Sequence, residues 1–200
     1  MYDIKGLIFD LDGVLVDTAK YHFLAWKRLA KEIGIDFSKE DNEKLKGISR
    51  KESLDIILAF GNKDLSLAQR EELMAKKNDW YLEFINLMDP SEILPGVLSF
   101  INDSKKNGYK IALGSASKNA LLILKILDIG QLFDVIIDGN ISSNSKPNPE
   151  VFLKGAEGLG LKSSECIVFE DAVAGIEAGL NAGMICIGIM ILRPSLPMEA

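Results

Sequence analysis

The stretch FDLDGVLVDT, residues 9–18, places three aspartates at the end of a short apolar run. Side chains alternate along an extended chain, so Asp10 and Asp12 are expected on the same side of the backbone. Two carboxylates this close repel each other unless a cation lies between them or one of them holds a proton. Such an oxygen-rich cluster suits Mg²⁺, and Gly13 allows a tight turn beside it. The alternative is that these aspartates are ordinary solvated turn residues.

The charge of the whole chain limits its partners. The 200 residues carry a formal net charge of −6, so no basic field attracts nucleic acid or an anionic membrane. The longest apolar run, residues 184–192, is far shorter than the roughly 20 residues that span a bilayer. The N-terminal residues lack the basic stretch and apolar core that are typical of a signal peptide. We therefore expect a cytoplasmic protein with no nucleic-acid or membrane partner. Separately from these observations, we expect a monomer that acts on a small molecule.

The apolar runs of the chain are short, rich in Ile and Val, and bounded by turn formers, which is typical of buried strands. They occur at residues 4–9, 109–113, 135–137, 166–169 and 184–191. Helical patterns separate most of them, at residues 97–106, 118–127 and 150–158. This alternation predicts an α/β fold with a doubly wound, Rossmann-like parallel sheet covered by helices on both faces. Ligands of such sheets bind beyond the carboxyl ends of the strands.

One long segment interrupts the alternation. Between the first and second expected strands, residues 18–88 contain helical patterns at 19–34, 50–61 and 66–88 and no strand pattern. A helical insert that emerges beside the acidic stretch is expected to cover the site as a cap. We predict a core domain of residues 1–16 and 90–200 and a helical cap domain of residues 17–89.

Three further groups follow later strands, and each has an ordinary explanation when taken alone. Ser115 could be a helix cap, Lys146 a solvated charge, and Glu170 with Asp171 an acidic pair favoured at a helix start. Together with Asp10 they supply a nucleophilic carboxylate, a metal cage, and a hydroxyl and an ammonium for phosphate oxygens. Phosphoryl transfer requires this set, because it depends on positioning and charge neutralisation.

The same residues carry a family resemblance. FDLDGVLVDT, GSASKN, SKPNPEVF and FEDAVAGIEAG occur in this order and resemble the four motifs of the haloacid dehalogenase superfamily. The helical insert resembles the small α-helical cap of one of its subclasses. Within the insert, DTAKYHFLAWKRLAKEIGI, LKGISRKESL and KKNDWY are similar to sugar-phosphate mutases of the superfamily.

This resemblance implies an isomerase of carbohydrate metabolism. It would interconvert β-D-glucose 1-phosphate and glucose 6-phosphate through an aspartyl-phosphate enzyme and β-glucose 1,6-bisphosphate. The alternative within the superfamily is a phosphatase that hydrolyses a small sugar phosphate. A phospho-accepting signalling module also combines acids, a hydroxyl and a lysine around Mg²⁺, but its phosphorylated aspartate follows a middle strand, whereas Asp10 follows the first.

The resemblance also implies roles for residues of the core. Asp10 would be the nucleophile, and Asp12 would be the general acid and base. The Mg²⁺ ligands would be the Asp10 side chain, the Asp12 carbonyl and Asp171, with Glu170 helping through water. The groups that bind the transferring phosphoryl would be Ser115, Lys146 and the backbone N–H of Ala116.

The resemblance places the other end of the substrate under the cap. Arg50 would grip the distal phosphate, because a planar guanidinium suits a dianion. Thr18 and His22 would lie at the hinge that couples cap closure to the placement of Asp12. The remaining residues lining the pocket would be Gly47, Ile48, Ser49, Lys77, Ser117 and Asn119. Without the resemblance, Arg50 is an ordinary surface arginine and His22 an ordinary residue of an amphipathic helix.

The end of the sequence departs from the family's pattern. After residue 183 it reads MICIGIMILRPSLPMEA. The segment GIMIL before the Arg-Pro pair is longer than the short turn found there in the family. We expect the last strand and the edge of the sheet to differ accordingly. Cys166 and Cys186 lie in separate apolar runs without a metal-binding spacing, so we expect two buried free thiols.

Overall fold

The computed structural model describes residues 3–190 of the chain. Its centre is a five-stranded sheet in the order β3-β2-β1-β4-β5, in which every neighbouring pair is parallel. The strands are β1 (Gly6–Phe9), β2 (Lys110–Gly114), β3 (Val135–Ile137), β4 (Cys166–Glu170) and β5 (Ile185–Gly188). The doubly wound parallel sheet that the alternating pattern predicts is confirmed.

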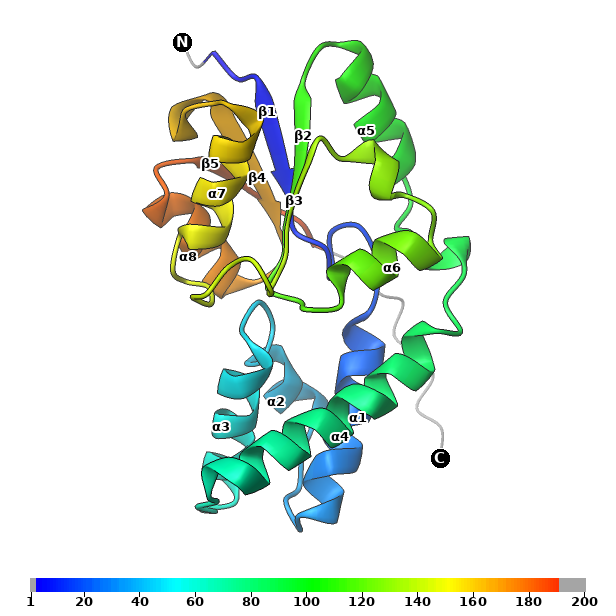
Figure 1. Cartoon of the computed structure of the whole chain (residues 1–200), viewed down its shortest axis with the longest axis vertical. Coiled ribbons are helices and arrows are strands. Elements are labelled where there is room, and N and C mark those ends of the chain that lie inside the picture. The colour runs from blue at the N-terminus through cyan, green and yellow to red at the C-terminus, as the bar shows by residue number, and fades with distance from the viewer. Residues whose placement is uncertain (1–2, 191–200) are drawn as a thin grey trace.

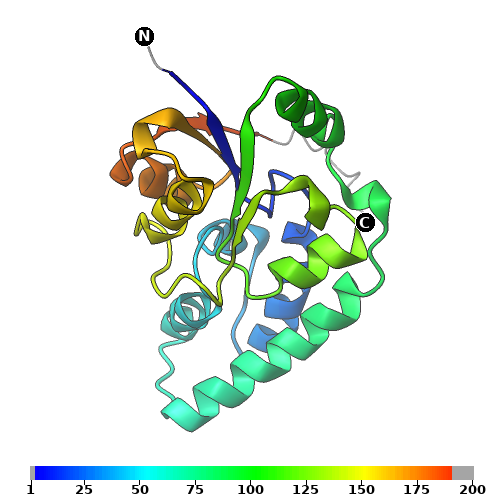
Figure 2. The same ribbon diagram turned by 45° about the horizontal axis from the view of Figure 1, so that its top comes forward.

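Helices cover the sheet on both faces, as Figures 1 and 2 show. One face carries α5 (Val97–Lys106) and α6 (Ala120–Ile126), and the other carries α7 (Glu150–Leu159) and α8 (Val173–Asn181). All four residues of β1 are buried. Ile8 belongs to the apolar cluster on the α7 side, whereas Phe9 belongs to the cluster on the α5 side. Burial on both faces explains why β1 is an unbroken apolar run rather than an alternating one.

Four helices lie within residues 17–89, at the carboxyl end of the sheet (Figure 1). They are α1 (Ala19–Glu32), α2 (Lys39–Glu43), α3 (Arg50–Phe60) and α4 (Leu67–Ile85). Three of them match the expected helical patterns, while α2 has five residues and too little periodicity to be predicted. The division into a core and a cap stays a prediction, and α1–α4 are called the cap helices below.

Three of the four cap helices begin with a strong local signal. Ser38, Ser49 and Ser66 are the N-caps of α2, α3 and α4, and each forms a reciprocal capping box with the residue three positions later. Each box satisfies backbone N–H groups that a helix start leaves without partners. The cap therefore owes its helix boundaries largely to local sequence.

The two connections between the sheet and the cap helices run side by side. Val16 forms an antiparallel bridge with Ile93, and the N–H of Leu94 donates to the carbonyl of Leu15 at 2.9 Å. The short 3-10 helix η1 (Pro90–Glu92) belongs to the second connection, which leads from α4 back to α5. The first residues after β1 and the last residues before α5 thus form one narrow junction.

Several details at the end of the chain differ from expectation. The strand expected at 184–191 is β5, which ends at Gly188, and residues 191–200 lie outside the described part of the chain. Both thiols are free, but Cys186 is only half-buried because β5 lies at the edge of the sheet. No helix in residues 3–190 is both long and apolar enough to cross a bilayer.

Candidate active site

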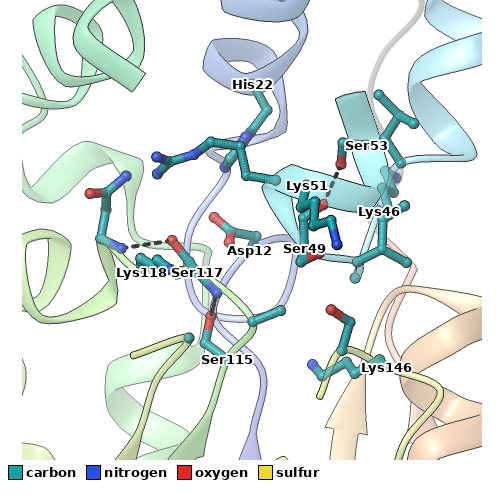
Figure 3. Close-up of a pocket in the computed structure, with 18 of the residues that line it drawn as sticks. Asp12, His22, Lys46, Ser49, Lys51, Ser53, Ser115, Ser117, Lys118 and Lys146 are labelled. Carbon is teal, nitrogen blue, oxygen red and sulfur yellow. Dashed lines mark hydrogen bonds between the residues drawn. The ribbon is translucent and has the colours of Figure 1, made fainter. Parts of the chain in front are cut away.

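A cavity of about 780 Å³ separates the strand ends from the cap helices. Figure 3 shows Asp12 near its middle, with Ser115 and Lys146 on the core side and His22 and Ser49 on the cap side. Most of the predicted site residues line it: Asp10, Asp12, His22, Gly47, Ile48, Ser49, Arg50, Lys77, Ser115, Ala116, Ser117, Asn119, Lys146 and Asp171. Thr18 and Glu170 lie behind this lining and reach it through neighbours, as described below.

A carboxylate cluster lies at the ends of β1 and β4. Asp10, Glu170 and Asp171 each place one oxygen within 4.8 Å of the others. Lys146 Nζ lies 2.6 Å from Asp10 Oδ1 and 2.7 Å from Glu170 Oε1, so one ammonium joins two of the three acids. The side chain of Asp12 is not part of this cluster. Of the four residues predicted to hold the metal, three therefore present side-chain oxygens together.

The turn after β1 brings these acids close to one another. Gly13 has φ +85°, and a Cβ at this position would collide with the carboxylate of Asp171. Only glycine therefore allows the turn to approach Asp171 this closely. This is the tight turn that the sequence predicts beside the acidic pair.

Burial makes the negative charge of the cluster costly. It raises the pKa of Asp10 well above its ordinary value, and it raises the pKa of Asp171 to about 6, with Glu170 adding repulsion. Burial alone would lower the pKa of Lys146, but the attraction of Asp10 and Glu170 outweighs it and raises that pKa. A hard divalent cation would suit this cluster, because its positive charge would stabilise the ionised form of the carboxyl groups.

Asp12 is tied to the start of the cap. Thr18, the N-cap residue of α1, is fully buried and donates its hydroxyl to Asp12 Oδ1. Burial, with repulsion from Asp171, raises the pKa of Asp12 to about 7. A carboxyl group of this pKa can both accept and release a proton near neutral pH.

The loop after β2 forms part of the cavity wall on the core side. Ser115 is buried, and its Oγ accepts from the N–H of Ser117 at 3.1 Å, while Ser117 Oγ accepts from the N–H of Asn119 at 3.2 Å (Figure 3). Among residues 3–190 the N–H of Ala116 has no acceptor, so it is available to a ligand.

This geometry excludes two of the ordinary explanations. Ser115 is not a helix cap, because the two serine turns delay α6 until Ala120, and Asn119 precedes that helix. Lys146 is not a solvated charge, because it is 1% exposed.

The loop between α2 and α3 brings the cap against the core. Gly47 has φ +74°, and a Cβ on it would lie 3.1 Å from the Cβ of Ala172. Glycine permits this approach, since any side chain would push the loop away from the start of α8. Lys46 Nζ lies 3.5 Å from Asp171 Oδ2. A cap ammonium therefore lies beside the carboxylate cluster.

The cap side of the cavity contains a guanidinium that donates to a neutral side chain. Arg50 Nη2 donates to Asn78 Oδ1 at 2.6 Å, and Asn119 Nδ2 donates to the same oxygen at 2.9 Å. Burial lowers the pKa of Arg50. Arg50 is thus half-buried and faces the cavity, so it is not an ordinary surface arginine.

A second cation of the cap is almost fully buried. Lys77 is 2% exposed, and its Nζ lies 2.9 Å from His22 Nδ1. The rings of Trp26 and Tyr81 pack around the ammonium, with their centroids 4.8 and 4.6 Å from Lys77 Nζ. Burial, with repulsion from Arg50, lowers the pKa of Lys77 well below its ordinary value. His22 is therefore a neighbour of this buried cation at the cavity wall.

Some cavity residues were not predicted. Lys46, Lys51 and Lys118 line it, and Asn78 lies directly behind Arg50 and Asn119. The three lysines each adjoin a predicted residue in sequence, so this adjacency could have identified them. Asn78 adjoins Lys77, but nothing in its sequence context reveals that it contacts two separate elements.

The chain is similar to proteins of known activity over most of its length. Residues 4–183 match the sequence model of haloacid dehalogenase-like hydrolases. A β-phosphoglucomutase of Bacillus subtilis is 44% identical over 195 residues, which cover 96% of this chain and 86% of that protein. A phosphorylated carbohydrates phosphatase of Thermotoga maritima is 30% identical over 184 residues, covering 90% of this chain and 82% of that one.

A solved structure is also similar to this chain. A crystal structure of β-phosphoglucomutase from Clostridium difficile superposes with a TM-score of 0.89 at 48% sequence identity. The match covers 92% of this chain and 84% of that structure. The similarity therefore includes both the sheet and the cap helices.

Proposed function

This chain belongs to the haloacid dehalogenase-like hydrolase family, and within it we propose a β-phosphoglucomutase that interconverts β-D-glucose 1-phosphate and glucose 6-phosphate. One observation carries this proposal: the cavity has anion-binding groups at both ends. On the core side Lys146 contacts Asp10 and Ser115 lines the cavity, while Arg50 lines it from the cap helix α3 and shares the acceptor Asn78 with Asn119. A mutase must hold a sugar with two phosphates, whereas a hydrolase needs only the first of these seats. The 44% and 48% identities to β-phosphoglucomutases support the same conclusion.

In the first step, a carboxylate oxygen of Asp10 attacks a phosphoryl group. A bond forms between this oxygen and phosphorus, the bond to the donor oxygen breaks, and an aspartyl phosphate results. Ser115, Lys146 and the N–H of Ala116 orient the phosphoryl oxygens and neutralise part of their charge. When bound by Asp10, Asp171 and the carbonyl of Asp12, with Glu170 beside it, Mg²⁺ would neutralise the rest.

In the second step, the phosphoryl group passes to the sugar. Asp12 accepts the proton of the attacking sugar hydroxyl while the new oxygen–phosphorus bond forms and Asp10 is released as a carboxylate. A pKa of about 7 suits this exchange, because the same residue must return a proton when the bisphosphate gives up its other phosphoryl group. The bond from Thr18 fixes the orientation of the carboxyl group.

The cap residues act on the sugar's other phosphate. Arg50 and Asn119 would bind it, and Lys77 would lie nearby with few competing anions. A cap held against the core also keeps water from the aspartyl phosphate, which favours transfer to the sugar over hydrolysis. The protein would work as a cytoplasmic monomer, and its net charge of −6 disfavours binding to nucleic acid.

The test is to follow the fate of β-glucose 1-phosphate with Mg²⁺ and a trace of bisphosphate. Glucose 6-phosphate, measured with a coupled dehydrogenase, should account for nearly all of the substrate consumed, and Asp10→Asn is the inactive control. Inorganic phosphate and glucose in equal amounts would instead establish the phosphatase, the activity named for the Thermotoga maritima relative.

A further inference from the structure

We propose that Asn78 is a positioning residue that joins the cap to the core and orients the two side chains facing the distal phosphate. It lies in α4, and its Oδ1 accepts from Arg50 in α3 at 2.6 Å and from Asn119 before α6 at 2.9 Å. One oxygen thus connects three segments that are separate in sequence. The inference rests on the proposed function, since the distal phosphate belongs to the sugar substrate.

The geometry is suited to this double contact. A carbonyl oxygen has two lone pairs and can accept both hydrogen bonds at once. The bond from the guanidinium is short, as expected for a charged donor. Asn78 does not line the cavity, whereas Arg50 and Asn119 do. It can therefore influence a ligand only through these two neighbours.

The residue type matters because Asn78 is neutral. Within residues 3–190, Arg50 has no carboxylate within ion-pair distance, although Asp79 acts on it from further away, and Asn78 is the side chain that accepts its hydrogen bond. A carboxamide holds the guanidinium without cancelling its charge. A carboxylate at this position would accept the same bonds, but it would neutralise the cation and repel a phosphate.

The bond from Asn119 also reports the position of the cap. Asn119 follows the strand β2 of the sheet, whereas Asn78 lies on a cap helix, so this contact exists only while the cap lies against the core. A distal phosphate bound by Arg50 and Asn119 would need the same relative placement. Asn78 therefore favours, before the substrate arrives, the arrangement that the substrate requires.

The first test compares Asn78→Ala with the nearly isosteric Asn78→Leu. Glucose 6-phosphate binding, measured by calorimetry, should weaken by about 10-fold to 100-fold in both, as expected for loss of a hydrogen bond to a charged group. Phosphorylation of Asp10 by acetyl phosphate, which has no distal phosphate, should be unchanged. Asn86→Ala, on the exposed end of the same helix, is the control and should alter neither measurement.

A double-mutant cycle tests whether Asn78 acts through its neighbours. In the Arg50→Ala background, Asn78→Ala should cost far less than it does in the wild type, because the group that it orients has been removed. Asn78→Asp should keep both hydrogen bonds and still weaken phosphate binding. Fully additive effects, or wild-type affinity in Asn78→Asp, would overturn the inference.

These results separate the inference from the proposed function. Wild-type protein that neither binds glucose 6-phosphate nor produces it would refute the mutase. Wild-type protein that does both, with unchanged affinity in Asn78→Ala and Asn78→Leu, would refute only the role of Asn78.

Discussion

The two halves of the cavity differ in the sign of the charge that they bury. The core half contains Asp10, Glu170 and Asp171, and the buried ammonium of Lys146 contacts the first two of them. The cap half contains Arg50 and Lys77, whose nearest partners are the neutral side chains of Asn78 and His22. In both halves, burial disfavours the charged form: it raises the pKa values of Asp10 and Asp171 and lowers those of Arg50 and Lys77.

This difference shows what each half needs. The core has more carboxylates than cations, so a divalent cation would complete it. The cap has basic groups whose side-chain partners are neutral, and a bound anion would favour their charged forms. A substrate with a phosphate at each end meets both requirements. The core half therefore performs the chemistry, and the cap half recognises the part of the substrate that does not react.

Asp10→Asn should have the largest effect, because it removes the nucleophile on which the core half depends. We expect turnover to fall by about 10⁴-fold or more and the phospho-enzyme to disappear. Mass spectrometry after incubation with acetyl phosphate measures the phospho-enzyme directly. Residual turnover equal to that of the wild type would show that the core chemistry has been assigned to the wrong residue.

Asp12→Ala should separate the two steps within the core half. The first phosphorylation, from acetyl phosphate, should continue, whereas transfer to the sugar hydroxyl should slow by about 10²-fold to 10⁴-fold, as expected for loss of a general base. Rapid-quench measurement of phospho-enzyme decay with and without glucose 6-phosphate tests this. Equal slowing of both steps would mean that Asp12 supports the structure of the site rather than proton transfer.

Arg50→Ala should weaken the cap half and leave the core half intact. Loss of a charged contact to the distal phosphate should lower kcat/KM for sugar phosphates by about 10-fold to 100-fold. Phosphorylation by acetyl phosphate should be unaffected, because this donor does not reach the cap. If both activities fall together, the comparison between the two halves fails.

Ser66→Ala should have the smallest effect, because it concerns only the stability of a cap helix. It removes the capping box of α4, so the free energy of unfolding should fall by about 1 kcal/mol. Urea denaturation measures this loss. Because Ser66 does not line the cavity, kcat should not change, and a large loss of kcat would show that α4 transmits strain to Lys77.

The sequence by itself determined the fold class, because both of its signals are local. Short Ile- and Val-rich runs separated by helical periodicity specify a parallel sheet. Asp10, Ser115 and the pair Glu170–Asp171 stand at strand ends, which places them at one edge, whereas Lys146 reaches this edge from the loop before α7. The helix starts at Ser49 and Ser66 are equally local, since a capping box involves residues three positions apart. The order of the acidic pair, serine, lysine and second acidic pair also identified the chemistry.

Only the tertiary structure decided which side chains meet. The contact of Asn78 with Arg50 and Asn119 joins residues 28 and 41 positions away, and Lys146 reaches Asp10 across 136 positions. The pairing of Thr18 with Asp12, and the placing of Lys77 beside His22, likewise depend on how the cap helices pack. Burial, which shifts the pKa values of these groups, is a property of the packed chain, and no local pattern can specify it.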